Sequence, residues 1–375
     1  MTMRVLTVFG TRPEAIKMAP VVRALAAEAG VEARVCVTGQ HREMLDQVLG
    51  LFEIFPEYDL NVMRRGQDLV HITSAVMAGV SDVVKDFLPH RVLVHGDTTT
   101  AMAATLAAFY HRVSVGHVEA GLRTGDLARP FPEEMNRCVV DVMADQQYAP
   151  TAGAKDNLLR SGSLPERIFV TGNTVIDALL MVVERIERDS DLKRRLENQF
   201  EFVDFSRRLI LVTGHRRESF GRSFDNICHA IADLARRNDA EIVYPVHLNP
   251  NVQEPVRRIL SGVPNVHLVD PLDYLPFVYL MSRAAILLTD SGGIQEEGPS
   301  LGKPVFVMRE VTERPEALEA GTVRLVGTDR ARIVGAVSGV LDEPSAYRAM
   351  TLRQNPYGDG RAAGRIVSAI LDRAD

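Results

Sequence analysis

The sequence predicts an α/β protein made of two Rossmann-like domains, each with a doubly wound parallel sheet. Short runs rich in Val, Ile and Leu alternate with longer helical patterns along the whole 375-residue chain. Several of the short runs are apolar without alternation, which is typical of parallel strands that are covered on both faces. The series of strands and helices runs twice, so we expect two domains built from right-handed βαβ units.

The expected strands end where polar motifs begin. In the first half of the chain they are 4–9, 33–38, 91–95, 114–118, 147–149 and 168–171. In the second half they are 209–213, 241–246, 266–269, 286–289, 304–308 and 323–326. The clearest helical patterns are 13–28, 99–110, 223–236 and 330–341. Ligands of open α/β sheets bind beyond the carboxyl ends of the strands, so two such domains facing each other would form one shared cleft.

Composition and charge are those of an ordinary soluble globular protein. The apolar fraction is 46%, the charged fraction is 25%, and the net charge of −6 comes with both signs interspersed. There is no basic stripe, which argues against nucleic acid as a partner. No stretch is apolar enough for a membrane span and the N-terminus does not resemble a signal peptide, so we expect a cytoplasmic protein. Cys36, Cys138 and Cys228 are few and far apart, which favours reduced core thiols.

The first strand runs into a helix start that carries two cations. The motif is Gly10-Thr11-Arg12-Pro13-Glu14, and Lys17 follows within the helix. Proline suits the start of a helix, and Arg12 beside a helix N-terminus is well placed to bind an anion or a carboxylate. An arginine that bonds only to a loop carbonyl has the same sequence context, so this motif alone leaves both interpretations open.

Three carboxylates lie where strands end or the next helix starts. Asp97 follows the strand 91–95, Glu119 follows the strand 114–118, and Glu133 opens a helix. Asp97 could serve only as a helix cap, and Glu133 only as a partner of the helix dipole. Glu119 ends an apolar strand, where a buried carboxylate needs a partner or a function. Together the three would form one rim that supplies acid and base catalysis.

The second half repeats the pattern of the first with residues suited to an anion. His215 follows the strand 209–213, in the place that Arg12 has in the first half. Arg314 lies in a second Arg-Pro-Glu motif, whose proline again suits a helix start. His215 could also be an ordinary loop residue.

The strand 286–289 runs into a turn of small residues, Ser291-Gly292-Gly293, that opens a helix. Glycine lets backbone N–H groups approach phosphate oxygens, and a helix N-terminus favours negative charge. Glu297, one turn later, could accept hydrogen bonds from ribose hydroxyls. The structural alternative is a glycine turn that only closes a βα connection.

The chain lacks several well-known cofactor motifs. There is no G-x-G-x-x-G after a strand, no P-loop and no H-E-x-x-H, and no histidine pairs with a cysteine at metal-ligand spacing. We therefore expect neither a nicotinamide cofactor nor a metal ion.

The chain closely resembles the non-hydrolysing bacterial UDP-N-acetylglucosamine 2-epimerases over essentially its whole length. The motifs that carry the resemblance are residues 9–17, 40–45, 95–98, 117–124, 131–134, 214–218, 291–293 and 355–360. The resemblance implies a glycosyltransferase-B-like fold with the active site in the interdomain cleft. The expected domains are 1–172 and 173–357, with the last helix, 358–375, packing back on the first domain.

The resemblance also implies interconversion of UDP-GlcNAc and UDP-ManNAc without metal or nicotinamide, which would supply ManNAc units for surface polysaccharide synthesis. By motif position, the contacts with the nucleotide sugar would be Arg12, Lys17, Asp97, Glu119, His215, Leu272, Phe277, Ser291, Gly292, Gly293, Glu297 and Arg314. Some members carry glutamine where this chain has Leu272, so uracil would be read there through the backbone.

The chemistry explains why such residues are needed. The C2 proton of the sugar is poorly acidic, because carbon 2 is not next to a carbonyl. Elimination of UDP would give 2-acetamidoglucal, and re-addition with a proton on the other face would invert carbon 2. Asp97, Glu119 and Glu133 would supply base and acid, with the order left open. His215, Arg314 and the glycine turn would stabilise the departing diphosphate. The alternatives are a UDP-sugar glycosyltransferase of the same fold, a hydrolysing relative and a nucleotide-sugar sensor.

Bacterial members of the family can be activated by UDP-GlcNAc at a second site adjoining the active site. Gln40 and His41 after the second strand, Glu134 beside Glu133, and His247 after a second-domain strand would surround that ligand. The alternative is that these are polar loop residues and a helix-start acid. We also expect a homodimer.

Overall fold

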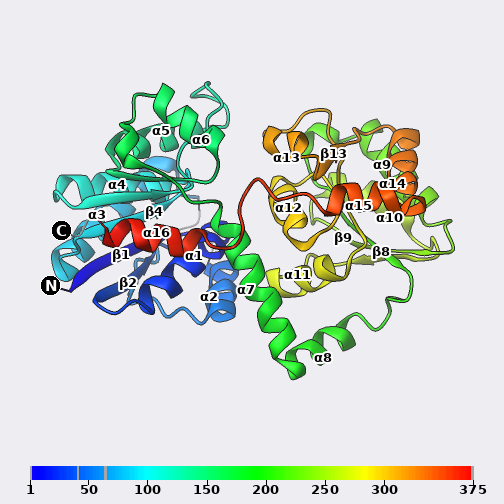
Figure 1. Cartoon of the computed structure of the whole chain (residues 1–375), viewed down its shortest axis with the longest axis horizontal. Helices are drawn as coiled ribbons and strands as arrows, with labels where there is room; N and C mark the ends of the chain where they lie inside the picture. The colour runs from blue at the N-terminus through cyan, green and yellow to red at the C-terminus, as the bar shows by residue number, and fades with distance from the viewer. Residues whose placement is uncertain (1, 40–41, 63–65, 373–375) are drawn as a thin grey trace. The chain divides into compact units, whose positions relative to one another are not determined.

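The computed structural model describes residues 2–39, 42–62 and 66–372. It divides into two compact units (Figure 1), Met1–Ala178 with Tyr357–Asp375, and Leu179–Pro356. The division falls within helix α7 (Thr174–Arg188). Each unit is a parallel sheet covered by helices, which confirms the fold class expected from the sequence.

The sheet of the first unit has the strand order β3-β2-β1-β4-β5-β6-β7, and every pair is parallel. The strands are β1 (Met3–Phe9), β2 (Val31–Val37), β3 (Tyr58–Asp59), β4 (Arg91–His95), β5 (Ser114–Val118), β6 (Gln146–Ala149) and β7 (Ile168–Val170). The helices are α1 (Arg12–Ala26), α2 (Arg42–Phe52), α3 (Leu69–Phe87), α4 (Thr99–Tyr110), α5 (Glu133–Met143), α6 (Ala152–Arg160), the 3-10 turn η1 (Pro165–Arg167) and α16 (Ala362–Leu371).

Helix α4 is apolar around its whole circumference, because it packs against the sheet and between α3 and α5. The core on this face joins strand residues such as Val8 and Val94 to Ala104 of α4 and Val80 of α3. Helix α16 lies beside α1, although the two are far apart in the sequence (Figure 1). Asp177 accepts the first backbone N–H groups of α16 and so fixes the end of the chain on this unit.

The sheet of the second unit has the order β10-β9-β8-β11-β12-β13 and is also parallel throughout. The strands are β8 (Arg208–Thr213), β9 (Ala240–Pro245), β10 (Val266–Val269), β11 (Ile286–Thr289), β12 (Val305–Val307) and β13 (Val323–Leu325). The helices are α8 (Ser190–Gln199), η2 (Arg217–Ser219), α9 (Arg222–Leu234), α10 (Pro250–Leu260), α11 (Tyr274–Arg283), α12 (Gly292–Glu297), η3 (Gly298–Leu301), α13 (Pro315–Glu319), α14 (Arg330–Asp342) and α15 (Pro344–Thr351). Its core includes Ile210, Phe224, Ile242 and Phe306.

Both sheets reverse their strand order at the same place. In the first unit the reversal lies between β1 and β4, and in the second between β8 and β11. Open α/β sheets bind ligands beside such a switch point, at the carboxyl ends of the strands. The loops that follow these four strands are therefore where a site is expected in each unit.

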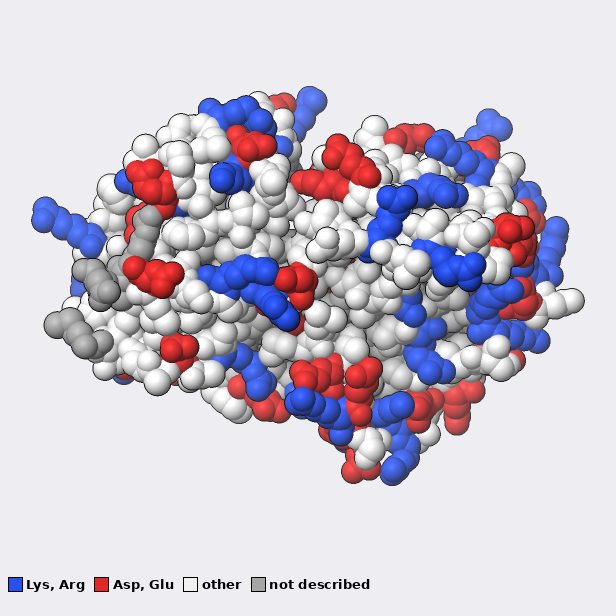
Figure 2. Space-filling view, viewed as in Figure 1, with Lys and Arg blue, Asp and Glu red and all other residues white. Residues whose placement is uncertain are grey.

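Among the residues that the structure describes, the helices and the surface charges are those of a chain without a membrane-spanning helix or, in the view of Figure 2, a one-sign surface. No helix in the described part of the chain is both long and apolar enough to cross a membrane. Lys and Arg side chains are interspersed with Asp and Glu over the visible face of each unit (Figure 2).

Candidate active site

The loop that follows β1 holds Arg12, half-buried, at the first position of α1. The side chain of Thr11 caps the helix, and the buried carboxylate of Glu14 accepts the N–H groups of Gly10 at 3.1 Å and Thr11 at 2.8 Å. The other oxygen of Glu14 accepts the hydroxyl of Thr98, in the loop after β4, at 2.6 Å. Burial raises the pKa of Glu14 against the effect of these hydrogen bonds. The two loops at the switch point are thus tied together.

Glu119 stands at the carboxyl end of β5 in a strained backbone conformation. Its φ of 64° lies in the left-handed region, which costs a residue with a side chain roughly 1–2 kcal/mol. The carboxylate pairs with Lys17 of α1 and accepts a hydrogen bond of 3.1 Å from Asn173. Strain that the surrounding structure maintains at a polar strand end points to a function for Glu119.

His95, the last residue of β4, faces Glu119 from a buried position. Its Nε2 atom lies 3.8 Å from Oε2 of Glu119, and neither ring nitrogen makes a hydrogen bond within the described residues. Burial lowers the pKa of His95 to about 3 in spite of the nearby carboxylate. The ring is therefore neutral at neutral pH.

Asp97 and Glu133 are both connected to helix α5. The carboxylate of Asp97 pairs with Arg137, and its backbone carbonyl accepts a hydrogen bond of 2.9 Å from the side chain of Asn136. Glu133, half-buried, is the first residue of this helix. The helix that begins with one expected catalytic carboxylate therefore also positions another.

The neighbouring Glu134 holds the loop after β5. Its side chain is buried, with 1% exposed. One oxygen accepts the N–H groups of Thr124 and Gly125, each at 3.0 Å, and the other pairs with Arg137 at 3.0 Å. This role of Glu134 was not predicted from the sequence. Gln40 and His41, which were expected beside Glu134 in a second ligand site, lie outside the described residues.

In the second unit the switch point is organised by Asp290, which follows β11. One oxygen of this fully buried carboxylate accepts the N–H groups of His215 at 2.7 Å and Arg216 at 2.8 Å. The other oxygen lies 3.3 Å from Nδ1 of His215. The ring of His215 stacks on the exposed His247, with ring centroids 5.4 Å apart. Burial lowers the pKa of His215, although Asp290 acts in the opposite direction.

The turn after β11 brings a guanidinium group against the backbone. A Cβ atom on Gly292 would lie 2.6 Å from Cζ of Arg314, so only glycine leaves this space. Arg314 donates to Glu296 at 2.8 Å and to Glu313 at 2.7 Å. Ser291 precedes the helix at its N-cap position. The expected anion site therefore combines a small-residue turn with an oriented arginine.

Glu297 lies in the same helix and is buried. Its carboxylate accepts the hydroxyl of Tyr274 at 2.8 Å, and a Cβ atom on Gly293 would lie 3.4 Å from its other oxygen. Phe277 follows Tyr274 by one turn of α11, and Leu272 lies in the loop before that helix; both are half-buried. The hydroxyl of Tyr274 thus ties the start of α11 to the helix that follows the glycine turn.

A model of the UDP-N-acetylglucosamine 2-epimerase family matches residues 23–371. The chain belongs to this family. It is 60% identical over 369 residues to the UDP-N-acetylglucosamine 2-epimerase of Escherichia coli (strain K12), covering 98% of each chain. The resemblance inferred from the motifs is thus confirmed.

Solved structures of the epimerase family agree with the fold. The UDP-GlcNAc 2-epimerase of Neisseria meningitidis, crystallised with UDP-GlcNAc, matches with a TM-score of 0.90 and 51% identity, covering 99% of this chain and 100% of that one. The Methanocaldococcus jannaschii enzyme in complex with UDP-GlcNAc and UDP matches with a TM-score of 0.79 and 31% identity, covering 99% and 100%. The glycosyltransferase-B-like fold expected from the sequence is therefore confirmed.

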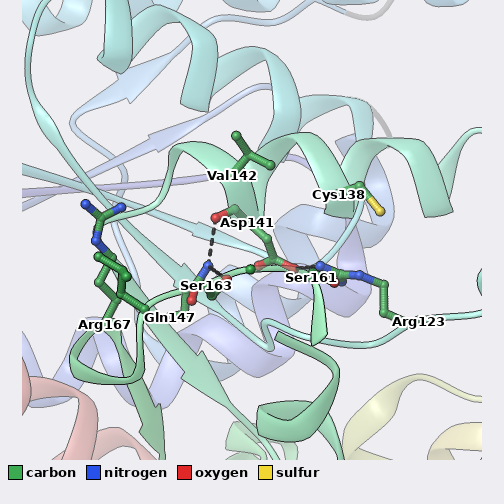
Figure 3. Close-up of a pocket in the computed structure, with 10 residues that line it drawn as sticks. Arg123, Cys138, Asp141, Val142, Gln147, Ser161, Ser163 and Arg167 are labelled. Carbon is green, nitrogen blue, oxygen red and sulfur yellow. Dashed lines mark hydrogen bonds and ion pairs between the residues drawn. The ribbon is translucent and has the colours of Figure 1, made fainter. Parts of the chain in front are cut away.

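This member of the epimerase family also has a pocket of about 420 Å³ in its first unit, beside α5. It is lined by Arg123, Cys138, Asp141, Val142, Gln147, Ser161, Gly162, Ser163, Leu164 and Arg167. Figure 3 shows Arg123 directed at the carboxylate of Asp141. Its Nη2 atom lies 2.6 Å from Oδ2 of Asp141. Within residues 2–39, 42–62 and 66–372, no cluster of His, Cys, Asp and Glu has the arrangement of a metal site.

The structure brings several expected site residues together and shows further residues that support them. It brings Lys17 to Glu119, and it places His215, Ser291, Gly292 and Arg314 around one switch point. Sequence reasoning missed the buried polar residues that support these groups, which are Glu14, His95, His117, Asn136, Arg137, Asp141, Asn173 and Asp290. Glu14, His95 and His117 lie inside the quoted motifs and Asp290 directly precedes one, so their sequence position was the available signal.

Proposed function

We propose that this chain interconverts UDP-GlcNAc and UDP-ManNAc by elimination and re-addition of UDP. The reaction removes the C2 proton as UDP leaves carbon 1, which gives 2-acetamidoglucal and UDP. Return of UDP to carbon 1 with a proton added to the opposite face of carbon 2 completes the epimerisation. This chemistry needs an acid and a base for carbon 2 and a stabilised diphosphate leaving group.

The observation that carries the proposal is the carboxylate rim of the first unit. Glu119 keeps a strained backbone and is oriented by Lys17 and Asn173. Asp97 is oriented by Arg137. Together with Glu133 these carboxylates supply the acid and the base, because oriented carboxylates at a switch point are suited to proton transfer.

The second unit binds the nucleotide part of the substrate. Arg314, His215 and the N–H groups of the turn at Gly292 neutralise charge on the diphosphate as it leaves. Glu297 accepts the ribose hydroxyls, and Phe277 and Leu272 contact the uracil. Arg12 of the first unit contributes a further cation to the anionic substrate.

Deuterium incorporation tests the reaction. The protein is incubated with UDP-GlcNAc in heavy water, and proton NMR follows carbon 2 of both epimers. We expect deuterium at carbon 2 of UDP-GlcNAc and UDP-ManNAc, with no need for a sugar acceptor. The Glu119→Gln variant is the matched control and should lose the exchange. Turnover that leaves carbon 2 fully protonated would show that the proposal is wrong.

We also propose that UDP-GlcNAc activates the enzyme at a second site formed by Gln40, His41, Glu134 and His247. A ligand that contacts both domains would bind a closed cleft better than an open one. Such a ligand shifts the protein towards the closed cleft. The reaction started from UDP-ManNAc alone should show a lag that a trace of UDP-GlcNAc shortens, and His247→Ala should change the lag. A reverse reaction at full speed from the first instant would contradict this regulation.

The proposed function also includes the oligomeric state of the protein and its location in the cell. We propose a homodimer that works in the cytoplasm and supplies ManNAc units for surface polysaccharide synthesis. Light scattering during gel filtration should give twice the chain mass of 41.4 kDa. A mass equal to one chain at micromolar concentration would contradict the dimer.

A further inference from the structure

In the part of the chain that the structure describes, the ring of the buried His117 has two hydrogen-bond partners, a carboxylate and a backbone carbonyl. This residue lies in β5, two residues before Glu119, and its side chain is fully buried. Its Nδ1 atom lies 2.5 Å from Oδ1 of Asp141, and its Nε2 atom lies 2.7 Å from the backbone carbonyl oxygen of Gly96. A carbonyl oxygen cannot donate, and an ionised carboxylate cannot donate either. With Asp141 ionised, both hydrogen bonds can form together only if both ring nitrogens carry protons.

The surroundings favour the ionised form of Asp141. Burial alone would raise the pKa of Asp141, but His117 and Arg123 outweigh it and lower this pKa below its ordinary value. Arg123 lies 2.6 Å from the second carboxylate oxygen. A further titratable group near the ring is His95 of β4, which burial keeps neutral. The carboxylate of Asp141 thus lies in a buried row between the ring of His117 and the guanidinium of Arg123.

This row connects the elements that carry the carboxylate rim. Gly96, whose carbonyl accepts from His117, immediately precedes Asp97 and has a φ of +64°. Asp141 belongs to α5, the helix that begins with Glu133. Arg123 belongs to the loop that follows Glu119 and lines the pocket in Figure 3. The row therefore joins β4, β5, α5 and the loop after β5.

We propose that His117 is held as an imidazolium by Asp141 and is a positioning residue for the catalytic carboxylates. The ring is fully buried and has no lone pair left, so it neither contacts substrate nor transfers a proton to it. It acts through the backbone of Gly96 and of its own strand, which carry Asp97 and Glu119. Arg123 completes the row by keeping Asp141 ionised. The inference rests on the proposed epimerisation, in which these carboxylates perform the proton transfers.

The protonation state is measured on the whole protein without substrate. Histidine labelled with nitrogen-15 is incorporated, and ring nitrogen–proton correlations are recorded near neutral pH. The His117→Gln variant assigns the signals by difference. We expect a proton on both ring nitrogens of His117 in the wild type. In Asp141→Asn the amide can donate to Nδ1, so one of the two ring protons should disappear.

The effect on catalysis is measured with a matched pair of variants. Asp141→Asn should lower kcat by about tenfold, because sub-ångström misplacement of catalytic groups is costly. KM should change much less. Asp145→Asn is the control, because Asp145 pairs with Arg91 at 2.9 Å at the opposite, amino ends of β4 and β5. This variant should keep the wild-type kcat.

Two results would overturn the proposal. One is a single ring proton on His117 in the wild type, a measurement that does not depend on whether the variants fold. The other is a folded Asp141→Asn variant with the same kcat as Asp145→Asn. Failure of the proposed function is separate, because it would appear as wild-type protein that does not exchange deuterium into carbon 2.

Discussion

The two units place different chemistry on the same topology. Both are doubly wound parallel sheets with a switch point between their first and fourth strands in sequence. At this point the first unit carries Glu14 and Asp97, and β5 adds Glu119 beside them. The second unit carries His215 and a glycine turn covered by Arg314. One fold thus supports proton transfer in one copy and anion binding in the other, because function depends on the residues after the strands.

The residues that orient the site groups also differ in charge between the two units. In the first unit the half-buried Lys17 and the buried Arg137 hold carboxylates that face the site. In the second unit buried carboxylates, Asp290 and Glu296, hold the cationic or dipolar groups. Glu119, Asp97 and Arg314 are therefore each oriented by an opposite charge on the protein. We expect substitutions of the carboxylate rim to act mainly on kcat and those of Ser291 and Glu297 mainly on KM, and the predictions below test that division.

The largest effect is expected from neutralising the carboxylate rim. Asp97→Asn, Glu119→Gln and Glu133→Gln should each lower kcat by about 10²-fold or more, the usual scale for general acid–base groups. Ser291→Ala and Glu297→Ala should instead raise KM. Steady-state kinetics with UDP-GlcNAc gives both constants. Asp82→Asn, which changes an exposed carboxylate on α3, is the control. Carboxamide variants with a near-normal kcat would show that the rim does not perform the chemistry.

The sequence predicted the strands and the motif residues of this comparison, because both leave local signals. The strands 91–95, 114–118, 266–269 and 286–289 are found with the predicted bounds. Asp97 and Glu119 were predicted as site residues because polar residues directly after apolar strands lie at the ligand-binding edge of a parallel sheet. The strand β3 was missed, since two residues carry no recognisable pattern.

The supporting network could be predicted only in part. Glu134, Arg137 and Asp141 of α5 are spaced by three and four residues, which places them on one helix face. In the structure this polar face is buried. The left-handed conformation of Glu119 and the acceptor-only partners of His117 depend on tertiary contacts. No local pattern encodes such contacts.

A second prediction concerns acid stability and the buried imidazole of the first unit. The pKa of His95 is about 3 in the folded protein, against an ordinary value of 6.5. Between these values the unfolded chain binds a proton that the folded protein does not, so stability falls as pH falls. The loss is up to about 1.4 kcal/mol per pH unit. His95→Gln should flatten denaturant-derived stability between pH 6 and 4, relative to His247→Gln in the second unit. Parallel slopes in both variants would contradict this assignment.

A third prediction concerns the turn in the second unit. Gly292→Ala places a Cβ atom 2.6 Å from Cζ of Arg314, so the guanidinium must leave its position beside Glu296. Loss of one oriented charge-assisted contact should weaken UDP binding by about tenfold, with a smaller change in kcat. Calorimetric titration with UDP measures the affinity. Gly335→Ala in α14 is the control, because its Cβ atom would meet nothing within 4 Å. Equal affinities in the two variants would contradict the role given to this turn.

The smallest effect is expected from protonation of His215. Burial lowers the pKa of this imidazole, so the ring is neutral at pH 7 in the free protein. A diphosphate bound beside it stabilises the imidazolium and raises its pKa, so binding takes up a proton. By linkage, the affinity for UDP should rise as pH falls from 7 towards 6, by a few-fold at most. The titration of UDP itself acts in every variant, so the informative quantity is the difference between wild type and His215→Asn. If the two proteins show the same pH dependence, His215 does not contact the diphosphate. The anion site would then depend on Arg314 and the glycine turn alone.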